Sequence, residues 1–579
     1  MSNNPAPSEN KKSSRHKYKW TRYYRRKYPK FRGVQFQKLC DKGSHSTSSK
    51  RIKLDDDGDI EFDETRGYRF VDFINVFSAL SQFLICKDCQ KDVKFEERTM
   101  KGLGFQLVVI CECTSRFVNS CPIVNNTYEI NRRFVFVMRL LGVGKHGINL
   151  FCGFMDLCQR FSTTIYCSSL YHIENASKYV YEEVLKKAVE EEKKLTAEKY
   201  GTENATRLTV SGDDTCKKRG FSFRFSMTTL IGNLSNKVID LVLKSSFCQS
   251  CNDHKSKKGT QEYNIWYDSH EEECANNCKG NRRMKIDALK EMFGRSVEQH
   301  GIKYVSYIGD DEGYKAIVEF NPYGDDELVI KKECVVYLQK VMAVKLRKIK
   351  KNKNLSGEGV GKLTDDVIKE LIMYYNLAVR RNTDSLENMK RAIWARFYHR
   401  SSTNERPHHE FCPKGLDSWC KWRHAEANGT TAEFYHEPPL DKNVLRAIKP
   451  VYESLSASSL LERCLGDFNQ HSNKSFNSTF WKIAPKDLYS EPQIITIASY
   501  LATIVFNEGC FPLVTVLKLM GVKVGLYAKV CCEYSNGERI EAAGSSSATC
   551  EENLSDRQLQ SAEKDEDLEE SLHGSETSD

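Results

Sequence analysis

The chain has 579 residues, of which 40% are hydrophobic and 28% charged, with 22 cysteines and a formal net charge of +9. This composition excludes a chain that is disordered throughout, and the length predicts several domains. The longest apolar run, residues 494–506, is too short to cross a bilayer, and the polar N-terminus lacks the apolar stretch of a secretory signal. We therefore expect no membrane partner and a reducing compartment, where spaced cysteines bind metal rather than form disulfides.

Residues 1–65 are expected to form a disordered basic arm. Within it, residues 11–33 contain eleven Lys and Arg and no acid, with aromatic side chains interleaved. Cations neutralise phosphates while aromatic rings stack on exposed bases, so this pattern favours nucleic-acid binding. A solvated tail without a fixed partner is the alternative. The candidate contact residues are Trp20, Arg22, Tyr23, Arg25, Arg26 and Lys27.

A second basic cluster follows at Lys50, Arg51 and Lys53. Clusters of this kind are typical of nuclear import signals, although short basic runs also arise by chance. We therefore expect the protein in the nucleus. At the other end, residues 531–579 are expected to be a disordered acidic tail, because residues 551–579 hold eleven acids against Arg557 and Lys564.

The first group of cysteines lies in a compact segment, residues 66–140. Cys86 and Cys89 form a C-x-x-C pair and Cys111 and Cys113 a C-x-C pair, with a strand-like stretch between them. Four thiolates at this spacing can close a tetrahedron around Zn²⁺ and so stabilise a module with little apolar mass. We predict a zinc-ribbon-like module, with unliganded cysteines as the alternative.

The middle of the chain predicts a helical connector at 141–205, followed by an alternation of strands and helices over 206–350. We expect strands at 206–211, 220–230 and 237–244, a helix at 284–300, a strand at 303–308, a helix at 314–320, and a strand at 328–336 that leads into a basic helix. This order predicts an α/β fold with an RNase H-like core, a mixed five-stranded sheet with helices. Residues 351–454 predict a mainly helical insertion, and 455–530 a C-terminal helical part.

A second group of metal ligands falls between the third strand and the first helix of the predicted core. The pair Cys248 and Cys251 is followed about twenty residues later by His270 and Cys274, which is the ligand spacing of zinc fingers. His254 and Cys278 are competing ligands. We expect this group to stabilise a loop rather than to perform chemistry.

A third group is more widely spaced. It combines Cys334 with His409, Cys412 and Cys420 of the helical insertion. Because only the fold could bring Cys334 close to the other three, buried free cysteines are the alternative.

Two carboxylates occupy ends of predicted strands. Asp213 follows the first strand and Asp310 the fourth. RNase H-like nucleases and transposases place acids there to hold two divalent metals, one that activates the attacking oxygen and one that stabilises the leaving oxygen. Clustered carboxylates repel one another unless a cation neutralises them, which favours a functional role over that of two unrelated turn residues.

Several segments carry a resemblance to a known family. They begin at Asp213 (DDTCKKRG), Cys248 (CQSC), Arg295 (RSVEQHGIKY), Tyr307 (YIGDDE), Glu333 (ECVVYLQK), Pro407 (PHHEFCP), Asp417 (DSWC) and Asn473 (NKSFNSTFW). In this order they resemble the Mutator-like transposases, in the cysteine-rich version seen in arthropod genomes. The resemblance covers roughly residues 66–520.

The resemblance implies roles for the acids. Asp213 and Asp310 would be the first and second metal-binding acids, and Glu312 falls where the family often carries another. The third acid, expected at the start of a late helix, is replaced by Lys474, whose ammonium would oppose Mg²⁺ or Mn²⁺. Asp467 lies nearby but could substitute only through a rearranged backbone.

Two further positions depart from the family pattern. Cys216 stands where the family usually has Trp, and Tyr337 stands where a Cys-x-x-His pair would have its His. The second departure weakens the third predicted zinc site.

Three functions are compatible with these features. The first is a DNA-binding, zinc-binding relative of transposases with impaired catalysis. The second is an active DDE-type transposase or nuclease in which Asp467, Glu312 or another acid replaces the missing one. The third is a zinc-dependent nuclear adaptor. DNA, as transposon ends or genomic DNA, is the expected partner, with a homo-oligomer possible, and residues 345–353 are a second candidate for phosphate contacts.

Overall fold

The structure is a computed structural model that describes residues 62–63, 67–157, 161–203, 205–219, 222–278, 283–351, 355, 359–415, 418–466, 468, 470–484 and 491–548. All of these belong to one of two compact units, Ser46–Asp579; the other unit is Met1–His45. Several predicted features lie outside the described residues: the basic arm with Trp20, Arg22, Tyr23, Arg25, Arg26 and Lys27, the import cluster Lys50, Arg51 and Lys53, the acidic stretch 551–579, and Asp467.

The N-terminal module contains one helix and a three-stranded antiparallel sheet. Helix α2 (Phe73–Phe83) is followed by β1 (Lys94–Lys101), β2 (Gly104–Ile110) and β3 (Ser115–Asn119), with β2 in the centre. None of the described side chains of α2, β1 and β3 is buried. The apolar contribution to the stability of this module is therefore small.

Helical elements connect this module to the central sheet. The short strands β4 (Ile123–Val124) and β5 (Thr127–Tyr128) precede α3 (Glu129–Leu140), α4 (Lys145–Phe154) and the 38-residue α5 (Thr163–Tyr200). Helix α5 ends at Gly201, whose left-handed backbone (φ 67°) suits glycine.

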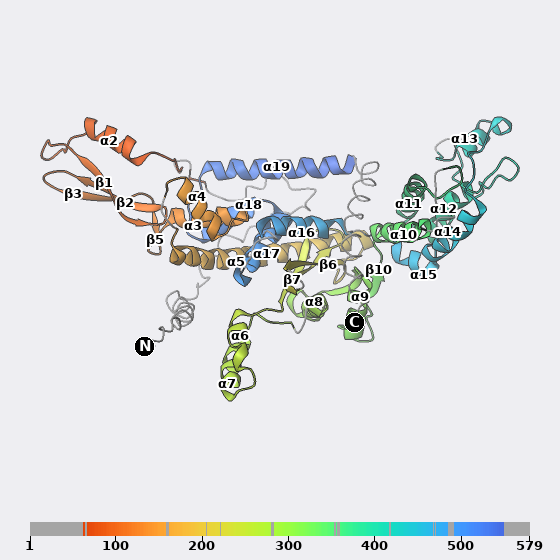
Figure 1. Ribbon diagram of the computed structural model, residues 1–579, viewed down its shortest axis with the longest axis horizontal. Coiled ribbons are helices and arrows are strands. Elements are labelled where there is room, and N and C mark those ends of the chain that lie inside the picture. The colour runs from red at the N-terminus through yellow and green to blue at the C-terminus, as the bar shows by residue number, and fades with distance from the viewer. Residues whose placement is uncertain are drawn as a thin grey trace, which may run out of the picture. The chain divides into compact units, whose positions relative to one another are not determined.

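The central sheet has five strands and mixed direction, as the sequence predicts (Figure 1). The strands are β6 (Arg207–Arg219), β7 (Ser222–Gly232), β8 (Val238–Ser245), β9 (Lys303–Ile308) and β10 (Ile330–Lys332), arranged in the order β10-β9-β6-β7-β8. Strand β9 pairs in parallel with β6 and β10, whereas β6, β7 and β8 form an antiparallel meander.

Helices α8 (Met284–His300) and α9 (Asp311–Phe320) flank β9 in sequence, and α8 packs against β7, β8 and β9. The core between them includes Leu208, Leu230, Leu289 and Phe293, all fully buried. The segment between β8 and α8 forms two helices, α6 (Gln249–Asp253) and α7 (Gln261–His270).

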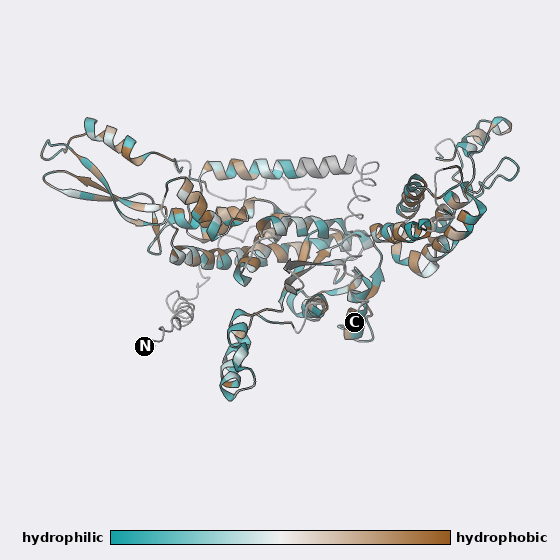
Figure 2. Ribbon diagram, viewed as in Figure 1, coloured by the Kyte–Doolittle hydropathy of each residue, from teal (hydrophilic) through white to brown (hydrophobic). Residues whose placement is uncertain are grey.

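Helices occupy the segment that the sequence predicts to be a mainly helical insertion, and α10 packs with this segment. Its helices are α10 (Val335–Lys350), α11 (Asp365–Arg380), α12 (Leu386–His399), α13 (Lys421–Ala427) and α14 (Lys442–Leu455). The sequence analysis assigned α10 to the sheet core, but its buried stripe of Leu338, Met342 and Leu346 joins the core of the insertion. These helices carry both hydrophobic and hydrophilic residues, as Figure 2 shows.

The C-terminal part contains α16 (His471–Ile483), α17 (Pro492–Glu508), α18 (Phe511–Leu519) and α19 (Leu526–Ala548). The tail was predicted to be disordered from residue 531, and this boundary is wrong because α19 continues to Ala548. Asn536 of this helix is buried, and its Oδ1 accepts a hydrogen bond from the Cys510 backbone N–H at 2.9 Å.

No single helix within the described ranges is long and apolar enough to cross a bilayer. The bent pair α3 and α4, at 116°, meets that criterion only when both helices are taken together, and by length and composition alone.

Candidate functional site

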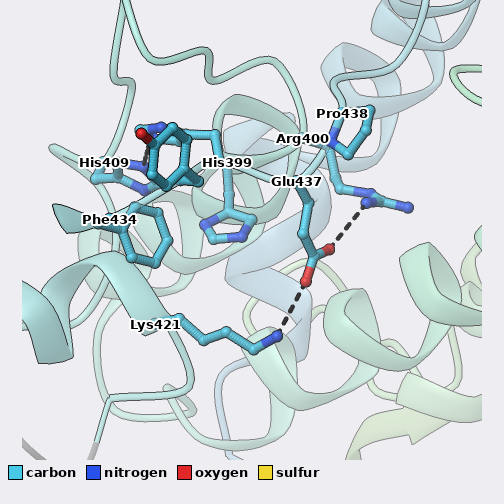
Figure 3. A pocket seen from close by; sticks show the side chains of 9 residues that line it. His399, Arg400, His409, Lys421, Phe434, Glu437 and Pro438 are labelled. Carbon is cyan, nitrogen blue, oxygen red and sulfur yellow. Dashed lines mark hydrogen bonds and ion pairs between the residues drawn. The ribbon is translucent and has the colours of Figure 1, made fainter.

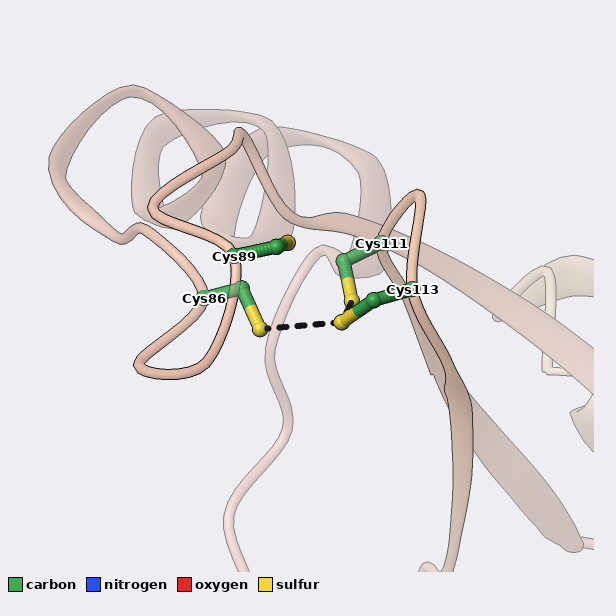
Figure 4. A group of neighbouring side chains, drawn as sticks. All are labelled: Cys86, Cys89, Cys111 and Cys113. Carbon is green, nitrogen blue, oxygen red and sulfur yellow. Dashed lines mark hydrogen bonds between the residues drawn. The ribbon is translucent and has the colours of Figure 1, made fainter.

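The first cysteine group forms as the spacing predicts. Cys86, Cys89, Cys111 and Cys113 bring their Sγ atoms within 4.8 Å of one another (Figure 4). Cys113 Sγ lies 3.1 Å from Cys111 Sγ and 3.6 Å from Cys86 Sγ. The backbone N–H groups of Cys89 and Asp88 point at the Cys86 thiol and lower its pKa to about 6, which favours the thiolate that zinc binds. The four residues fit a tetrahedral zinc ion.

The second group also forms, and the structure decides between its competing ligands. Cys248, Cys251, His270 and Cys274 come together, with Cys248 Sγ 3.3 Å from His270 Nε2 and Cys251 Sγ 3.4 Å from Cys274 Sγ. His254 instead contacts the Ser250 carbonyl through Nδ1 at 2.9 Å and stacks on Trp266.

Cys278, the other competing ligand, is also occupied elsewhere. Its thiol donates to Asp287 Oδ2 at 3.1 Å. The loop between β8 and α8 is thus fitted to hold a metal through four side chains, two of which come from one short helical turn.

The third group corrects the sequence analysis, because its fourth member is His399 and not Cys334. The Nδ1 atoms of His399 and His409 lie 3.6 and 3.5 Å from Cys420 Sγ, and 3.8 and 3.7 Å from Cys412 Sγ. All four ligand atoms lie within 4.8 Å of one another. Histidine is common at the C-terminal end of a helix such as α12, so His399 gives only a weak signal in the sequence.

Cys334 is the N-cap residue of α10 and lies in another core. It is buried with Ile308, Val336 and Phe468, beside the end of β9. Cys334 precedes His409 by 75 residues, and the fold does not bring it to the third group.

A second layer of side chains orients the third group. His436 Nδ1 donates to Asn404 Oδ1 at 2.9 Å, so its Nε2 accepts the N–H of His409 Nε2 at 2.9 Å. His409 therefore keeps its proton on Nε2 and turns the lone pair of Nδ1 toward the thiols, the tautomer that metal ligation needs. The adjoining pocket contains Glu437, which pairs with Lys421 and Arg400 (Figure 3).

The two predicted catalytic acids occupy equivalent positions relative to the pairing of β6 and β9. Ser211 on β6 is paired with Ile308 on β9, and Asp213 and Asp310 each follow that pair by two residues. Asp310 is the N-cap residue of α9, and its Oδ1 accepts the Gly313 N–H at 2.9 Å. Glu312 is exposed on the first turn of α9.

Helix α16 contacts Asp213 from one side. Asn477 Nδ2 donates to Asp213 Oδ2 at 3.1 Å, and Asn473 is fully buried, with its Oδ1 accepting from Ser211 Oγ at 2.7 Å. Lys474, between them in sequence, is exposed. Burial raises the pKa of Asp213 to about 6, even though Lys285 and Lys474 act to lower it.

Lys285, on the first turn of α8, is the residue that the sequence analysis missed. Its Nζ lies 2.6 Å from Asp310 Oδ2 and 3.0 Å from Asp214 Oδ1. Burial alone would lower the pKa of Lys285, yet Tyr307, Asp214 and Asp310 raise it above the ordinary value, so the side chain is an ammonium. A lysine on a predicted amphipathic helix gives no signal that it will reach two acids.

The acidic pocket, our name for the cluster of Asp213, Asp214 and Asp310 with Lys285, does not fit a pair of divalent metals. Mg²⁺ and Mn²⁺ need several converging oxygen ligands, and here an ammonium lies between Asp214 and Asp310. Within the described parts of the chain, three groups of side chains can hold a metal ion, and they are the Cys and Cys/His groups above.

The remaining family departures have plain local roles. Cys216 contacts Asp214 Oδ2 at 3.4 Å and Ser226 Oγ at 3.3 Å, while Tyr337 is half-exposed on α10. In the basic stretch at 345–353, Lys345 donates to Ser454 Oγ and Lys350 pairs with Asp365, so these two already have protein partners.

Comparison with known proteins places these features in a family. A family model described as Mutator-like transposase matches residues 67–420, a segment that includes the three Cys and Cys/His groups, Asp213, Lys285 and Asp310, and that ends before α16. No curated protein and no solved structure matches the chain. The match covers more than half of the 579 residues, and the chain belongs to the Mutator-like transposase family.

Proposed function

We propose that this protein is a Mutator-like transposase relative that binds DNA and structural zinc but is impaired in metal-dependent DNA strand transfer. The observation that carries the proposal is the composition of the acidic pocket. Asp213 on β6 and Asp310 after β9 each follow the paired residues Ser211 and Ile308 by two positions, and the helix that contacts Asp213 carries Lys474 in place of an acid.

The strand arrangement supports an RNase H-like core. The strand order is β10-β9-β6-β7-β8, in which β9 is parallel to β6 and the meander β6, β7 and β8 is antiparallel. This agrees with the sequence of three strands, helix, strand, helix and strand in that architecture. In such a core the catalytic acids lie on the first strand, after the fourth strand and on a later helix. The residues at the first two places are Asp213 and Asp310.

The contacts of α16 support the assignment of Lys474 to the third place. Asn473 and Asn477 both reach β6, one through Ser211 and the other through Asp213. Because these contacts hold α16 against β6, an acid at position 474 would lie near Asp213. A two-metal reaction needs both ions held, and a lysine at this position removes one ligand and adds a repelling charge.

The three Cys and Cys/His groups support structural zinc rather than catalytic zinc. Each offers four protein ligands, and a closed four-ligand set leaves no position for water or substrate. Zinc would therefore contribute folding free energy to the module, the loop and the insertion that carry these groups.

DNA binding and nuclear location are part of the proposal because of the N-terminal sequence. Eleven Lys and Arg between residues 11 and 33, with no acid, suit phosphate contacts. Affinity for duplex DNA should fall steeply as salt rises, with a slope of about 0.9 per phosphate contacted. Removal of residues 1–45 should flatten that slope, and an unchanged slope would argue against the arm.

Catalysis is tested by incubating the zinc-loaded protein with family-type transposon ends, or with generic duplex DNA, in Mg²⁺ or Mn²⁺. We expect DNA binding without cleavage or strand transfer. Cleavage by the unaltered protein that disappears in Asp213→Ala would show that another acid replaces the missing one, which is the active-transposase alternative. Absence of DNA binding at low salt would overturn the proposal altogether.

A further inference from the structure

Lys285 occupies the centre of the acidic pocket, and none of the expected family roles involves it. We infer that Lys285 is a resident counter-ion that keeps divalent metal out of this pocket, so that Lys474 is the second obstacle to metal binding and not the first. This inference rests on the proposed function, because it explains why the pocket of a transposase relative is closed to metal.

Lys285 contacts one of the two expected metal-binding acids, Asp310, and also Asp214, the neighbour of the other. Its Nζ takes Asp310 Oδ2 at 2.6 Å and Asp214 Oδ1 at 3.0 Å. The remaining oxygen of Asp310 accepts the Gly313 N–H, and that of Asp214 is contacted by the Cys216 thiol. Both acids therefore have both oxygens engaged by the chain itself.

The packing around Lys285 holds it in place. Its side chain is only 15% exposed, so it does not move freely in solvent. Tyr307 is fully buried and acts electrostatically on the lysine. A Cβ added at Gly212 or Gly309 would lie 2.5 or 2.4 Å from the Tyr307 ring. The absence of a side chain at these two glycines therefore leaves room for the ring.

Two lysines reduce the negative charge of the pocket. Lys285 pairs with Asp214 and Asp310, and both Lys285 and Lys474 act electrostatically on Asp213. An arriving divalent ion would have to displace the Lys285 ammonium from two carboxylates and leave it buried without a partner. A free acidic pocket of the same geometry would attract the ion instead.

The inference separates the two lysines. An acid at position 474 would face Asp213 from α16, whereas Lys285 reaches Asp214 and Asp310 from α8. Restoring the missing acid by Lys474→Glu should therefore leave the pocket closed. Metal should bind only when Lys285 is also removed.

The experiment measures Mn²⁺ binding to the full-length, zinc-loaded chain by electron paramagnetic resonance. The proteins compared are the unaltered chain, Lys474→Glu, Lys285→Met and the double variant. Lys244→Met is the matched control, because Lys244 is 12% exposed and pairs with Glu291 at 2.6 Å, outside the pocket. We expect the double variant to bind Mn²⁺ at least about tenfold more tightly than Lys474→Glu, and Asp310→Asn to abolish that gain.

Three results would overturn the inference: Mn²⁺ binding to the unaltered chain that Asp310→Asn removes, equal binding by Lys474→Glu and the double variant, or no binding by a folded double variant. If Lys285→Met unfolds, Lys285→Gln takes its place, and the Lys474→Glu protein tests the inference without any change at Lys285. Mn²⁺ uptake by an unaltered chain that binds DNA without cleaving it would refute the inference and leave the proposed function intact. If the double variant gains Mn²⁺ binding as expected but the protein does not bind DNA, the inference stands and the proposed function is refuted.

Discussion

The Cys and Cys/His groups and the acidic pocket differ in what their side chains face. In the first group, four cysteine sulfurs lie within 4.8 Å of one another. In the pocket, the carboxylates of Asp214 and Asp310 converge on the ammonium of Lys285. The Cys and Cys/His groups can hold a metal ion, whereas we propose that the ammonium in the acidic pocket keeps metal out.

The difference follows from what each metal does for the fold. Structural zinc supplies folding free energy, so the loss of one ligand unfolds the segment that carries it. A catalytic metal pocket is costly to fold, because buried carboxylates repel each other and lose hydration. Under the proposed function, a lysine placed among these carboxylates offsets their repulsion.

The largest expected effect is at the first cysteine group. Cys89→Ser should release one zinc ion and unfold the module from α2 to β3, because that module buries so little apolar surface. The lost binding free energy is on the order of 10 kcal/mol. Hydrogen exchange should show that residues 73–119 lose protection, whereas the central sheet keeps its protection. Retained protection in β1–β3 would show that the module folds without zinc.

The next effect distinguishes His399 from Cys334. His399→Ala should release the zinc of the third group and lower the free energy of unfolding of the insertion by more than about 4 kcal/mol, because loss of a metal is among the causes of the largest mutational effects. Cys334→Ser should leave the zinc content unchanged. Zinc is counted by mass spectrometry under native conditions. Loss of zinc in Cys334→Ser alone would restore the ligand set that the sequence suggested.

A smaller effect of opposite sign is expected in the acidic pocket. Because burial raises the pKa of Asp213 from 3.8 to about 6, the folded state binds its proton more tightly than the unfolded state, and stability falls as pH rises through this interval. Asp213→Asn should therefore increase the free energy of unfolding near pH 7 by about 2–3 kcal/mol, with no gain below about pH 4.

The matched control is Asp214→Asn, which removes a partner of Lys285 and should destabilise the protein at neutral pH. Both are measured by chemical denaturation across the pH range. A loss of stability in Asp213→Asn at neutral pH would show that this carboxylate is needed in its charged form.

The smallest effect concerns the docking of α16. Asn473→Ala should cost about 1–2 kcal/mol, because it leaves the buried Ser211 hydroxyl and carbonyl without their partner. Ser478→Ala, on the exposed side of the same helix, should cost less than about 0.5 kcal/mol. Equal effects in thermal unfolding would mean that Asn473 does not anchor α16 to the sheet.

Local patterns predicted much of this molecule. The order of strands and helices over β6–β10 follows from apolar periodicity and turn residues, and two of the three four-ligand groups follow from spacing within about thirty residues. These features depend on residues close in sequence, where pattern and geometry agree.

The features that pattern could not predict depend on packing between distant segments. His399 joins His409 because α12 ends beside the loop that carries Cys412 and Cys420. Lys285 reaches Asp310 across 25 residues because α8 packs on β9, and nothing in its own neighbourhood in sequence distinguishes it from a solvated lysine. The extension of α19 past residue 531 depends on the burial of Asn536 against Cys510, which is also a tertiary effect.

The most direct test of the account is the metal content of the full-length protein, measured by mass spectrometry under native conditions after exposure to zinc and Mn²⁺. We predict three zinc ions per chain, one for each group, and no retained Mn²⁺. A chain that holds Mn²⁺ in addition to zinc, and loses it on Asp310→Asn, would contradict the claim that the acidic pocket is closed to divalent metal.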